Sequence, residues 1–470
     1  MSCAPVAAAV AAALLAVAPG AAASAPAPPD SLRLALEEAV GRALARGEEM
    51  RSARAYVSQT AGLVRQEMSR ALPQITGSLT YDRKLNSIFE GATSDTSVLG
   101  DILANSPFAA ENSWTAELYG EQLLFSGGKV RAALGAAKAA NRSARAAEQE
   151  TAGDVTFEVT RAYYNAAYTL RLVEIARGSL ESAREHLRQV EAGRREGSKS
   201  EFDALRAEVD AANQEPALIE AGRGVDLTML ALKRLINVPL DQPLVLVTPL
   251  AFAGDLVPAV LEDTLSVAQR PALAAADAEV EARAQAVKVY RGQHWPDLYL
   301  SSTFQEQAFP GEVVPRWDDF RRNWNVAVRL SLPIFTGLRI EGQVQQAQAA
   351  LATAQAGRDR TRELVAIEAD EARSELDRSL STLLARRTTV RQAKRAFELA
   401  NVRYTNGMST QVEVTDARLQ YRTAEVNEVS ATRDYLVSFA RLERAIGHPV
   451  PAVRMPLEEA TKALNLEGTR

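Results

Sequence analysis

The sequence predicts a mostly α-helical protein with additional membrane-type β-strands, built from two copies of one unit. Apolar residues recur at seven-residue steps through two long stretches, a pattern typical of coiled-coil helices. Ahead of each stretch, short segments alternate between apolar and polar residues, which is typical of strands with one apolar face. The whole pattern recurs at an offset of 210 residues, which indicates an internal duplication.

The second long stretch, residues 338–447, predicts a helical hairpin. Its first arm carries apolar residues at strict sevens: Leu376, Leu383, Val390, Phe397 and Tyr404. The arm ends at Asn406-Gly407, where glycine takes positive φ without steric cost. The second arm repeats the spacing with Val412, Leu419 and Val426. At ~1.5 Å per residue the first arm is about 100 Å long, so we expect the hairpin to project from the rest of the protein.

The first half repeats this hairpin over residues 129–236. The offset places apolar or small residues and the turn glycine at the equivalent positions, namely Ala166, Val173, Leu180, Leu187, Gly197, Phe202 and Val209. It also maps Phe335-Thr336-Gly337 onto Phe125-Ser126-Gly127. A chance match between heptads would keep the phase but not the turn glycine and this flanking motif.

Each half also carries a helix and two strands ahead of its hairpin. We expect a first repeat over 26–236 and a second over 261–448. The helices are expected at about 32–71 and from about 261 to just before Pro296. The strands are expected near 74–86, 113–125, 297–307 and 323–335. Residues 237–260 form a proline-rich, irregular linker between the repeats, and 449–470 form a C-terminal tail.

The strands have the length of membrane strands. Segments of about ten residues, tilted by about 45°, cross a hydrocarbon layer. All four tryptophans lie in these two strand regions, where amphipathic rings favour a membrane interface: Trp114, Trp295, Trp317 and Trp324. A soluble sheet with one buried face is the alternative for any single strand. Open edges are not tolerated in lipid and four strands cannot close a barrel, so we expect other copies of the chain to complete it.

Residues 1–25 are expected to be a secretory signal peptide, since the apolar run Val6–Val17 is short and small residues follow it. The only cysteine, Cys3, precedes this run, so we do not expect a lipoprotein. No later stretch offers about 20 uninterrupted apolar residues, the length of a membrane-spanning helix.

Composition excludes several classes of function. The net charge of −5 argues against nucleic acid as the main partner. A single cysteine and three scattered histidines argue against a disulfide or a thiolate zinc site. We find no phosphate-binding loop and no nucleophile–base set, and we therefore expect neither an enzyme nor a bound cofactor.

Four segments resemble the motifs of the TolC-like outer-membrane factor family, also called outer membrane efflux proteins. They are Arg403–Gly407 and Val412–Ala417 at the second turn, and Leu124–Gly128 and Leu332–Gly337 at the strand-to-helix corners. The resemblance covers nearly the whole chain after the signal peptide. It implies a homotrimer in the outer membrane of a Gram-negative-type cell, with a large periplasmic portion. Three chains would form a twelve-stranded barrel, four strands from each, and a periplasmic barrel of coiled-coil hairpins.

The resemblance also implies a function. Members of this family are exit ducts of tripartite efflux pumps and type I secretion systems. The implied partners are a periplasmic adaptor protein, an inner-membrane RND or ABC transporter, and outer-membrane lipid. Two other classes remain open from the residues alone, a periplasmic adaptor and a coiled-coil scaffold, although two hairpins without lipoyl-like flanking segments disfavour the adaptor.

Glu413 and Asp416 are the candidate pore residues. They are three residues apart on a helix, so they share a face just after the hairpin turn. The resemblance assigns them to an acidic ring at the periplasmic constriction. The alternative is a solvated helix start, where the helix dipole favours acids.

The resemblance further implies a gate that holds the tips closed. Relatives use a tyrosine matched by Tyr404, an acid matched by Asp203, and an arginine at the position of Ser409. Because that arginine is missing here, Arg206 or Arg403 is the candidate substitute. The turns themselves depend on Gly197 and Gly407. The alternative role for Tyr404 is the last core residue of its heptad run.

Overall fold

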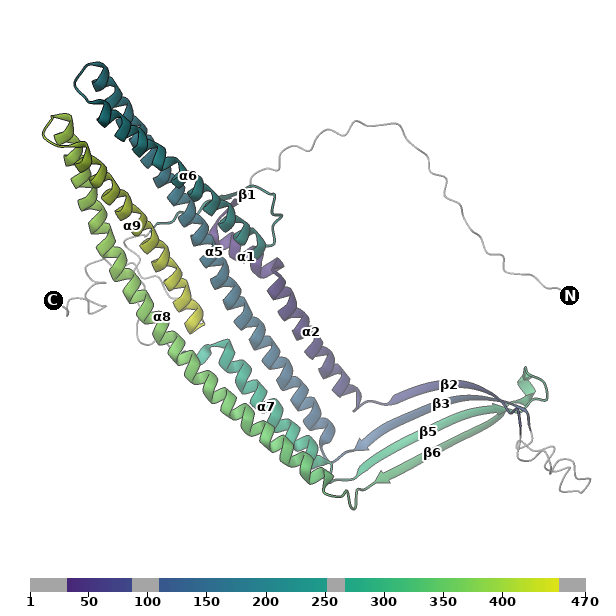
Figure 1. Cartoon of the computed structure of the whole chain (residues 1–470). Coiled ribbons are helices and arrows are strands. Elements are labelled where there is room, and N and C mark those ends of the chain that lie inside the picture. The colour runs from purple at the N-terminus through teal and green to yellow at the C-terminus, as the bar shows by residue number, and fades with distance from the viewer. Residues whose placement is uncertain (1–31, 87–109, 252–266, 448–470) are drawn as a thin grey trace, which may run out of the picture.

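A four-stranded sheet at one end joins a long helical body that ends in two hairpin tips (Figure 1). The computed structural model describes residues 32–86, 110–251 and 267–447. The expected fold class is confirmed, because both long helical hairpins and all four strands are present. The expected signal peptide, the tail 449–470 and the start of the expected helix at 261 lie outside the described residues.

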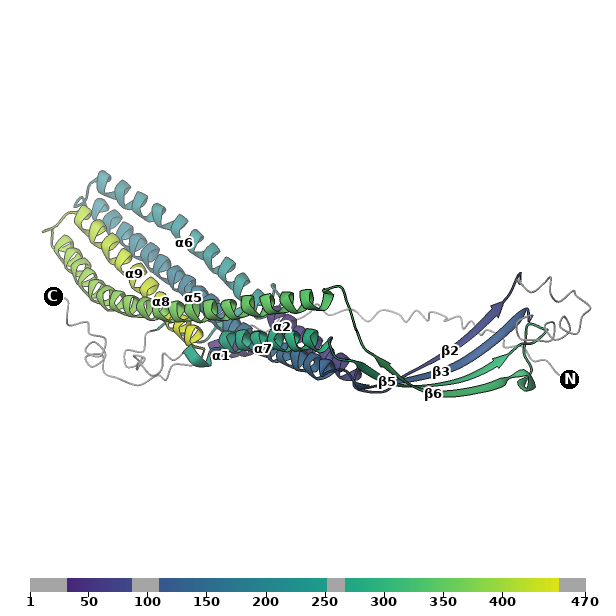
Figure 2. The same cartoon turned by 90° about the horizontal axis from the view of Figure 1, so that it is seen from below.

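The sheet has the strand order β2–β3–β5–β6, with every neighbouring pair antiparallel. The strands are β2 (Gln74–Arg83), β3 (Asn112–Phe125), β5 (Asp297–Ala308) and β6 (Arg321–Ser331). β6 ends two residues before Pro333, which cannot donate a ladder hydrogen bond. The sheet curves along its length in the second view (Figure 2).

The register places apolar side chains of all four strands on one face. Leu79 is opposite Ala116, Leu118 is opposite Phe304, and Phe304 is opposite Trp324, and cross-strand partners share a face. The alternation expected from the sequence therefore continues across the sheet. Many of these side chains are exposed, with 69% for Ile75 and 66% for Val328. The opposite face is polar, and on it Arg329 forms an ion pair with Glu121 at 2.7 Å.

Two helical hairpins form the body. The first consists of α5 (Lys129–Arg195) and α6 (Glu201–Leu235), and the second of α8 (Arg339–Thr405) and α9 (Gln411–Ile446). Two shorter helices, α2 (Glu48–Ser69) and α7 (Pro271–Gly292), lie along α5 and α8 in the half nearer the sheet (Figures 1 and 2). α5 also contacts α9, so the hairpins pack against each other.

The expected single helix over 32–71 is wrong, because the chain breaks at Gly47. Helix α1 (Leu36–Arg46) ends there and α2 begins. Gly47 has extended backbone angles, and a Cβ at this position would lie 2.4 Å from the carbonyl oxygen of Ala43. Only glycine fits this close approach, so the break follows from one residue within an otherwise helical pattern.

The described part of the linker, residues 237–251, is more ordered than expected. β4 (Leu244–Leu246) pairs in parallel with β1 (Leu32–Leu34), ahead of α1. Tyr163 of α5 is fully buried and links β1 to the residues just after β4, since its hydroxyl donates to the carbonyl of Leu34 at 3.0 Å and accepts from the amide of Thr248 at 2.9 Å. A pair of three-residue strands so far apart in sequence leaves no periodic signal.

The second repeat begins its described helix later than expected. A short 3₁₀ turn, Val267–Gln269, precedes α7, which starts at Pro271. Proline favours the first helical position and keeps the residue before it extended. Arg270 has those extended angles, with φ −64° and ψ 130°.

Candidate functional site at the hairpin tips

The two turns have the same backbone geometry. Gly197 and Gly407 have φ values of 77° and 71°. In each turn the residue after the glycine donates its amide hydrogen to a carbonyl five residues earlier, from Ser198 to Gly193 and from Met408 to Arg403. This is a helix C-terminal motif that depends on a left-handed residue, which explains the glycine at both positions.

Glu413 and Asp416 are both exposed in the first turns of α9. Thr410 caps the helix, accepting from the amide of Glu413. Ser409 donates its hydroxyl hydrogen to the Glu413 carboxylate at 2.6 Å. The serine at the position of the family arginine thus orients one of the two acids.

Asp203 and Arg403 make local contacts within their own turns. Asp203 accepts hydrogen bonds from the amide and hydroxyl of Ser200, at 3.1 and 2.7 Å, as part of the α6 capping box. These bonds, chiefly that from the hydroxyl, lower the pKa of Asp203, and the charges of Lys199 and Arg206 add to the effect. Arg403 contacts its own turn, 3.4 Å from the carbonyl oxygen of Met408 and 3.9 Å from Glu413. Among the described residues neither arginine forms an ion pair with Asp203, and Arg206, on the same helix, acts on Asp203 through its charge.

Tyr404 faces the first hairpin. Its ring lies 5.4 Å from that of His186 on α5, centroid to centroid. The ammonium of Lys199, in the first turn, is 4.1 Å from the centre of the Tyr404 ring. The stem of Lys199 crosses Gly193 so closely that a Cβ there would lie 2.7 Å from it. The Tyr404 hydroxyl is buried and has no hydrogen-bond partner among the described residues, so the structure does not join Tyr404 and Asp203 by a hydrogen bond.

An ion pair that could not be predicted from the sequence joins the two hairpins about two turns after the start of α9. Arg418 donates to Asp210 of α6 at 2.7 Å, and Arg422 donates to Gln214 at 2.6 Å. The two arginines are four residues apart on α9, and their two partners are four residues apart on α6. The contacts therefore join two consecutive turns of the two helices. The Arg418 side chain is only 11% exposed. The available signal was a polar stripe, because Gln411 and Arg418 are seven residues apart on the same helix.

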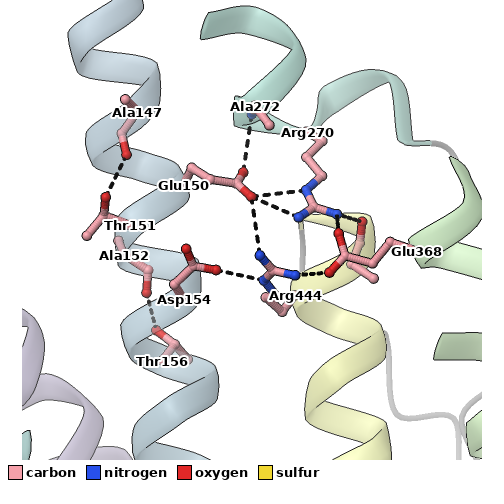
Figure 3. A network of polar contacts seen from close by, with 11 residues as sticks. Ala147, Glu150, Thr151, Ala152, Asp154, Thr156, Arg270, Ala272, Glu368 and Arg444 are labelled. Atoms are coloured by element: carbon pink, nitrogen blue, oxygen red, sulfur yellow. Dashed lines mark hydrogen bonds and ion pairs between the residues drawn. The ribbon is translucent and has the colours of Figure 1, made fainter. Parts of the chain in front are cut away.

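A second polar network joins the hairpins midway along the body (Figure 3). Arg270 is 2% exposed and donates to Glu150 of α5, Glu368 of α8 and the carbonyl of Ala445. Arg444 of α9 pairs with the same two glutamates and with Asp154. Four elements distant in sequence therefore meet at two arginines and three acids.

None of the helices in the described residues has an apolar stretch long enough to cross a membrane. No group of three or more histidine, cysteine or acidic side chains in the described ranges could hold a metal ion.

Comparisons with known proteins agree with this architecture. A family model described as "Outer membrane efflux protein" matches residues 39–238 and 264–448. Nodulation protein T of Rhizobium leguminosarum bv. viciae is 26% identical over 196 residues, which is 40% of this chain and 39% of that protein. Outer membrane protein OprJ of Pseudomonas aeruginosa is 24% identical over 181 residues, 38% of this chain and 37% of that protein. The aligned part thus spans about two fifths of either relative.

The fold is shared with solved channel structures. The Campylobacter jejuni CmeC outer membrane channel superposes with a TM-score of 0.74 at 18% identity, over 91% of this chain and 89% of that one. The family model covers most of the described residues, including both hairpins and all four strands. The chain belongs to the outer membrane efflux protein family.

Proposed function

We propose that this protein is an outer-membrane exit channel that works as a homotrimer and is gated at its hairpin tips. The observation that carries the proposal is the four-stranded sheet, which has an exposed apolar face, a polar opposite face and two edges that are unpaired within the described residues. Such a sheet is stable in lipid only when its edges are paired. Strand β2 of one chain therefore pairs with β6 of the next, and three chains close a twelve-stranded barrel.

Exposed apolar residues near the tips support assembly of the helical part. Phe202 and Val209 on α6 are 68% and 59% exposed, and Val412 and Leu419 on α9 are 48% and 57% exposed. The heptad pattern predicts these residues on a packed coiled-coil face, yet the single chain leaves them uncovered. Neighbouring chains cover them in the trimer, where the helices form a tunnel that continues the barrel.

The acids Glu413 and Asp416 form the narrow end of this tunnel. Three chains bring six carboxylates together there, and like charges at close range attract cations. Exposure of both side chains in the single chain is compatible with this role.

The gate uses Arg418 and Asp210 in place of the missing arginine at Ser409. This ion pair joins the two hairpins of one chain, is largely buried and is reinforced by the contact between Arg422 and Gln214. Neither Arg206 nor Arg403 takes this role. Arg403 contacts Glu413 of its own hairpin, and the charge of Arg206 helps to lower the pKa of Asp203 on its own helix. Tyr404 packs against the first hairpin as part of the same closed arrangement.

The channel is passive, and its energy comes from partners. An inner-membrane RND or ABC transporter supplies the driving force, and a periplasmic adaptor couples that transporter to the tips. The net charge of −5 supports a role without a nucleic-acid partner.

The test is divalent-cation block in planar lipid bilayers. Purified protein is expected to give discrete conductance steps that millimolar divalent cations block, and the double replacement Glu413→Ala/Asp416→Ala is expected to weaken the block. Glu371→Ala is the control, because Glu371 is an exposed acid of α8 roughly 50 Å from the turn at ~1.5 Å per residue. Unchanged block in the double variant contradicts the acidic ring, and the absence of conductance steps contradicts the channel itself.

A further inference from the structure

Near their tips the two hairpins meet at a seam formed by His186, Lys199 and Asp210 of the first hairpin and by Tyr404 and Arg418 of the second. His186 is the one histidine of the described residues in this seam. It is 4% exposed, and its Nε2 atom has no hydrogen-bond partner in the part of the chain that the structure describes. It belongs to α5, about three turns before the helix ends at Arg195. Histidine is the side chain whose ordinary pKa allows a charge change near neutral pH.

Charged or titratable groups from every element around the seam face His186. Tyr404 of α8 lies against its ring, and the ammonium of Lys199 in the first turn lies over the Tyr404 ring. Arg418 of α9 and Asp210 of α6 act on it electrostatically. Two cations, Arg418 and Lys199, and one acid, Asp210, surround His186. The Asp210 carboxylate is already paired with Arg418 at 2.7 Å.

Other buried polar atoms near the tips also lack hydrogen-bond partners among the described residues. The Tyr404 hydroxyl, both amide atoms of Gln411 and the Nε of Arg418 are buried and unpaired in the described part of the chain. Buried polar groups without partners cost free energy that water recovers when the groups are exposed. Hydration of these unpaired groups therefore favours opening of the seam, and the contacts across the seam oppose it.

A positive charge on His186 is unfavourable in the closed seam. Burial lowers the pKa of His186, the charges of Arg418 and Lys199 lower it further, and Asp210 opposes them. Once the hairpins part, water reaches the imidazole and its pKa returns toward the ordinary value of about 6.5. The open arrangement thus binds protons more strongly than the closed one.

We propose that His186 is a proton-binding site whose occupation separates the two hairpin tips. Its consequence for transport rests on the proposed function, whereas the separation itself does not. The state that binds more protons gains as pH falls, so the closed seam keeps its full stability above about pH 6.5 and loses it progressively below. At pH 5.5, one unit below the ordinary pKa, the ratio of open to closed tips rises by up to about tenfold.

The experiment measures the distance between spin labels on the two turns by pulsed electron resonance. The labels replace two exposed turn residues, Glu196→Cys and Met408→Cys. The only native cysteine, Cys3, lies within the expected signal peptide, and Cys3→Ser removes it from any unprocessed chain. Full-length protein in lipid nanodiscs is expected to show a longer-distance population that grows between pH 8 and pH 5.5.

The variant His186→Gln is expected to abolish this growth, and His294→Gln, a histidine outside the seam, is expected to keep it. If His186→Gln folds poorly, Lys199→Gln provides a second test. It removes one of the two neighbouring cations, which raises the pKa of His186 in the closed seam toward its ordinary value. The growth of the longer-distance population between pH 8 and pH 5.5 is therefore expected to be smaller in this variant. A distance distribution that does not change with pH in the labelled protein, or a response that persists in His186→Gln, overturns the proposal.

The labels report on the seam whether or not the protein conducts. A pH-independent seam in a protein that forms cation-blocked channels overturns only the role of His186. A pH-dependent seam in a protein that never forms channels overturns only the proposed function.

Discussion

The two helical hairpins are nearly the same length, yet they make different contacts. α5 and α8 both have 67 residues, and α6 and α9 have 35 and 36. Both turns use a left-handed glycine and the same pair of backbone hydrogen bonds. α5 nevertheless lies at the centre of the body, against α2, α6, α7 and α9, whereas the main contacts of α8 are with α7 and α9.

The difference shows which properties a duplicated unit keeps. Local geometry has been kept, because a turn glycine and a heptad act within their own hairpin. Charged groups have diverged, because each hairpin faces a different neighbour. Asp203 is part of the capping box of α6, whereas Glu413 at the start of α9 is held from outside its helix by Ser409.

The largest effect is expected at the polar network around Arg270, midway along the body. The buried arginine of this network belongs to the second repeat. Arg270 precedes α7, whereas Gly47 precedes α2, a helix of the same length of 22 residues. Arg270→Ala leaves Glu150 and Glu368 without one of their partners, and removing one partner of a buried pair costs about 3–5 kcal/mol. Urea unfolding followed by circular dichroism measures the loss.

Arg142→Ala is the matched control, because Arg142 pairs with Glu281 on the surface, and such pairs contribute about 0–1 kcal/mol. Equal losses for the two variants contradict a structural role for the network.

The strand-to-helix corners give the next largest effect. Gly127 and Gly337 are equivalent by the duplication and have φ values of 57° and 59°. A Cβ at position 127 would lie 2.3 Å from the Cβ of Trp295, whereas a Cβ at position 337 would meet no described atom within 4 Å. We expect Gly337→Ala to cost about 1–2 kcal/mol for the left-handed backbone, and Gly127→Ala about 2–5 kcal/mol because overpacking adds to it. The same loss of stability in both variants contradicts the asymmetry.

The cross-hairpin ion pair is expected to show a smaller effect. A double-mutant cycle of Arg418→Ala and Asp210→Ala should give a coupling free energy of about 1–3 kcal/mol, since the pair is hydrogen-bonded and mostly buried. The pair Arg184–Glu215, which is more than half exposed on both sides, should couple by less than about 1 kcal/mol. Equal coupling for the two pairs would show that Arg418 does not hold the tips.

The smallest difference is expected between the two turns. Gly197→Ala and Gly407→Ala should each cost about 1 kcal/mol, because both residues have positive φ and an added Cβ would meet no described atom within 4 Å at either position. Thermal unfolding of the two variants compares them directly. A cost at one turn well above the other would mean that the turns are not equivalent.

Features that depend on local periodicity could be predicted from the sequence. The heptad residues Leu376 and Leu383 are buried, and the turn glycines have the expected backbone angles. The alternating strands align their apolar faces across the sheet.

Features that depend on which faces meet could not be predicted in this way. Arg418 and Asp210 become partners only because two helices from different repeats come together near the tips. The exposed heptad residues Val412 and Leu419 show the same limit, since periodicity identifies an apolar face but not the surface that covers it. A gate contact between Tyr404 and Asp203 stays a prediction. In the structure Tyr404 contacts His186, and Asp203 accepts from Ser200.

The most direct test of the proposed assembly is disulfide formation between the two edge strands. β2 and β6 lie at opposite edges of the sheet in one chain, so they can meet only between chains. Single cysteines at Thr76, Ser78 or Thr80 are combined with single cysteines at Asn325, Ala327 or Arg329, and membranes are oxidised before denaturing electrophoresis. The account predicts that at least one combination gives covalent dimers and trimers and no larger species. Monomers alone in all combinations, or a ladder that continues beyond three chains, would contradict it.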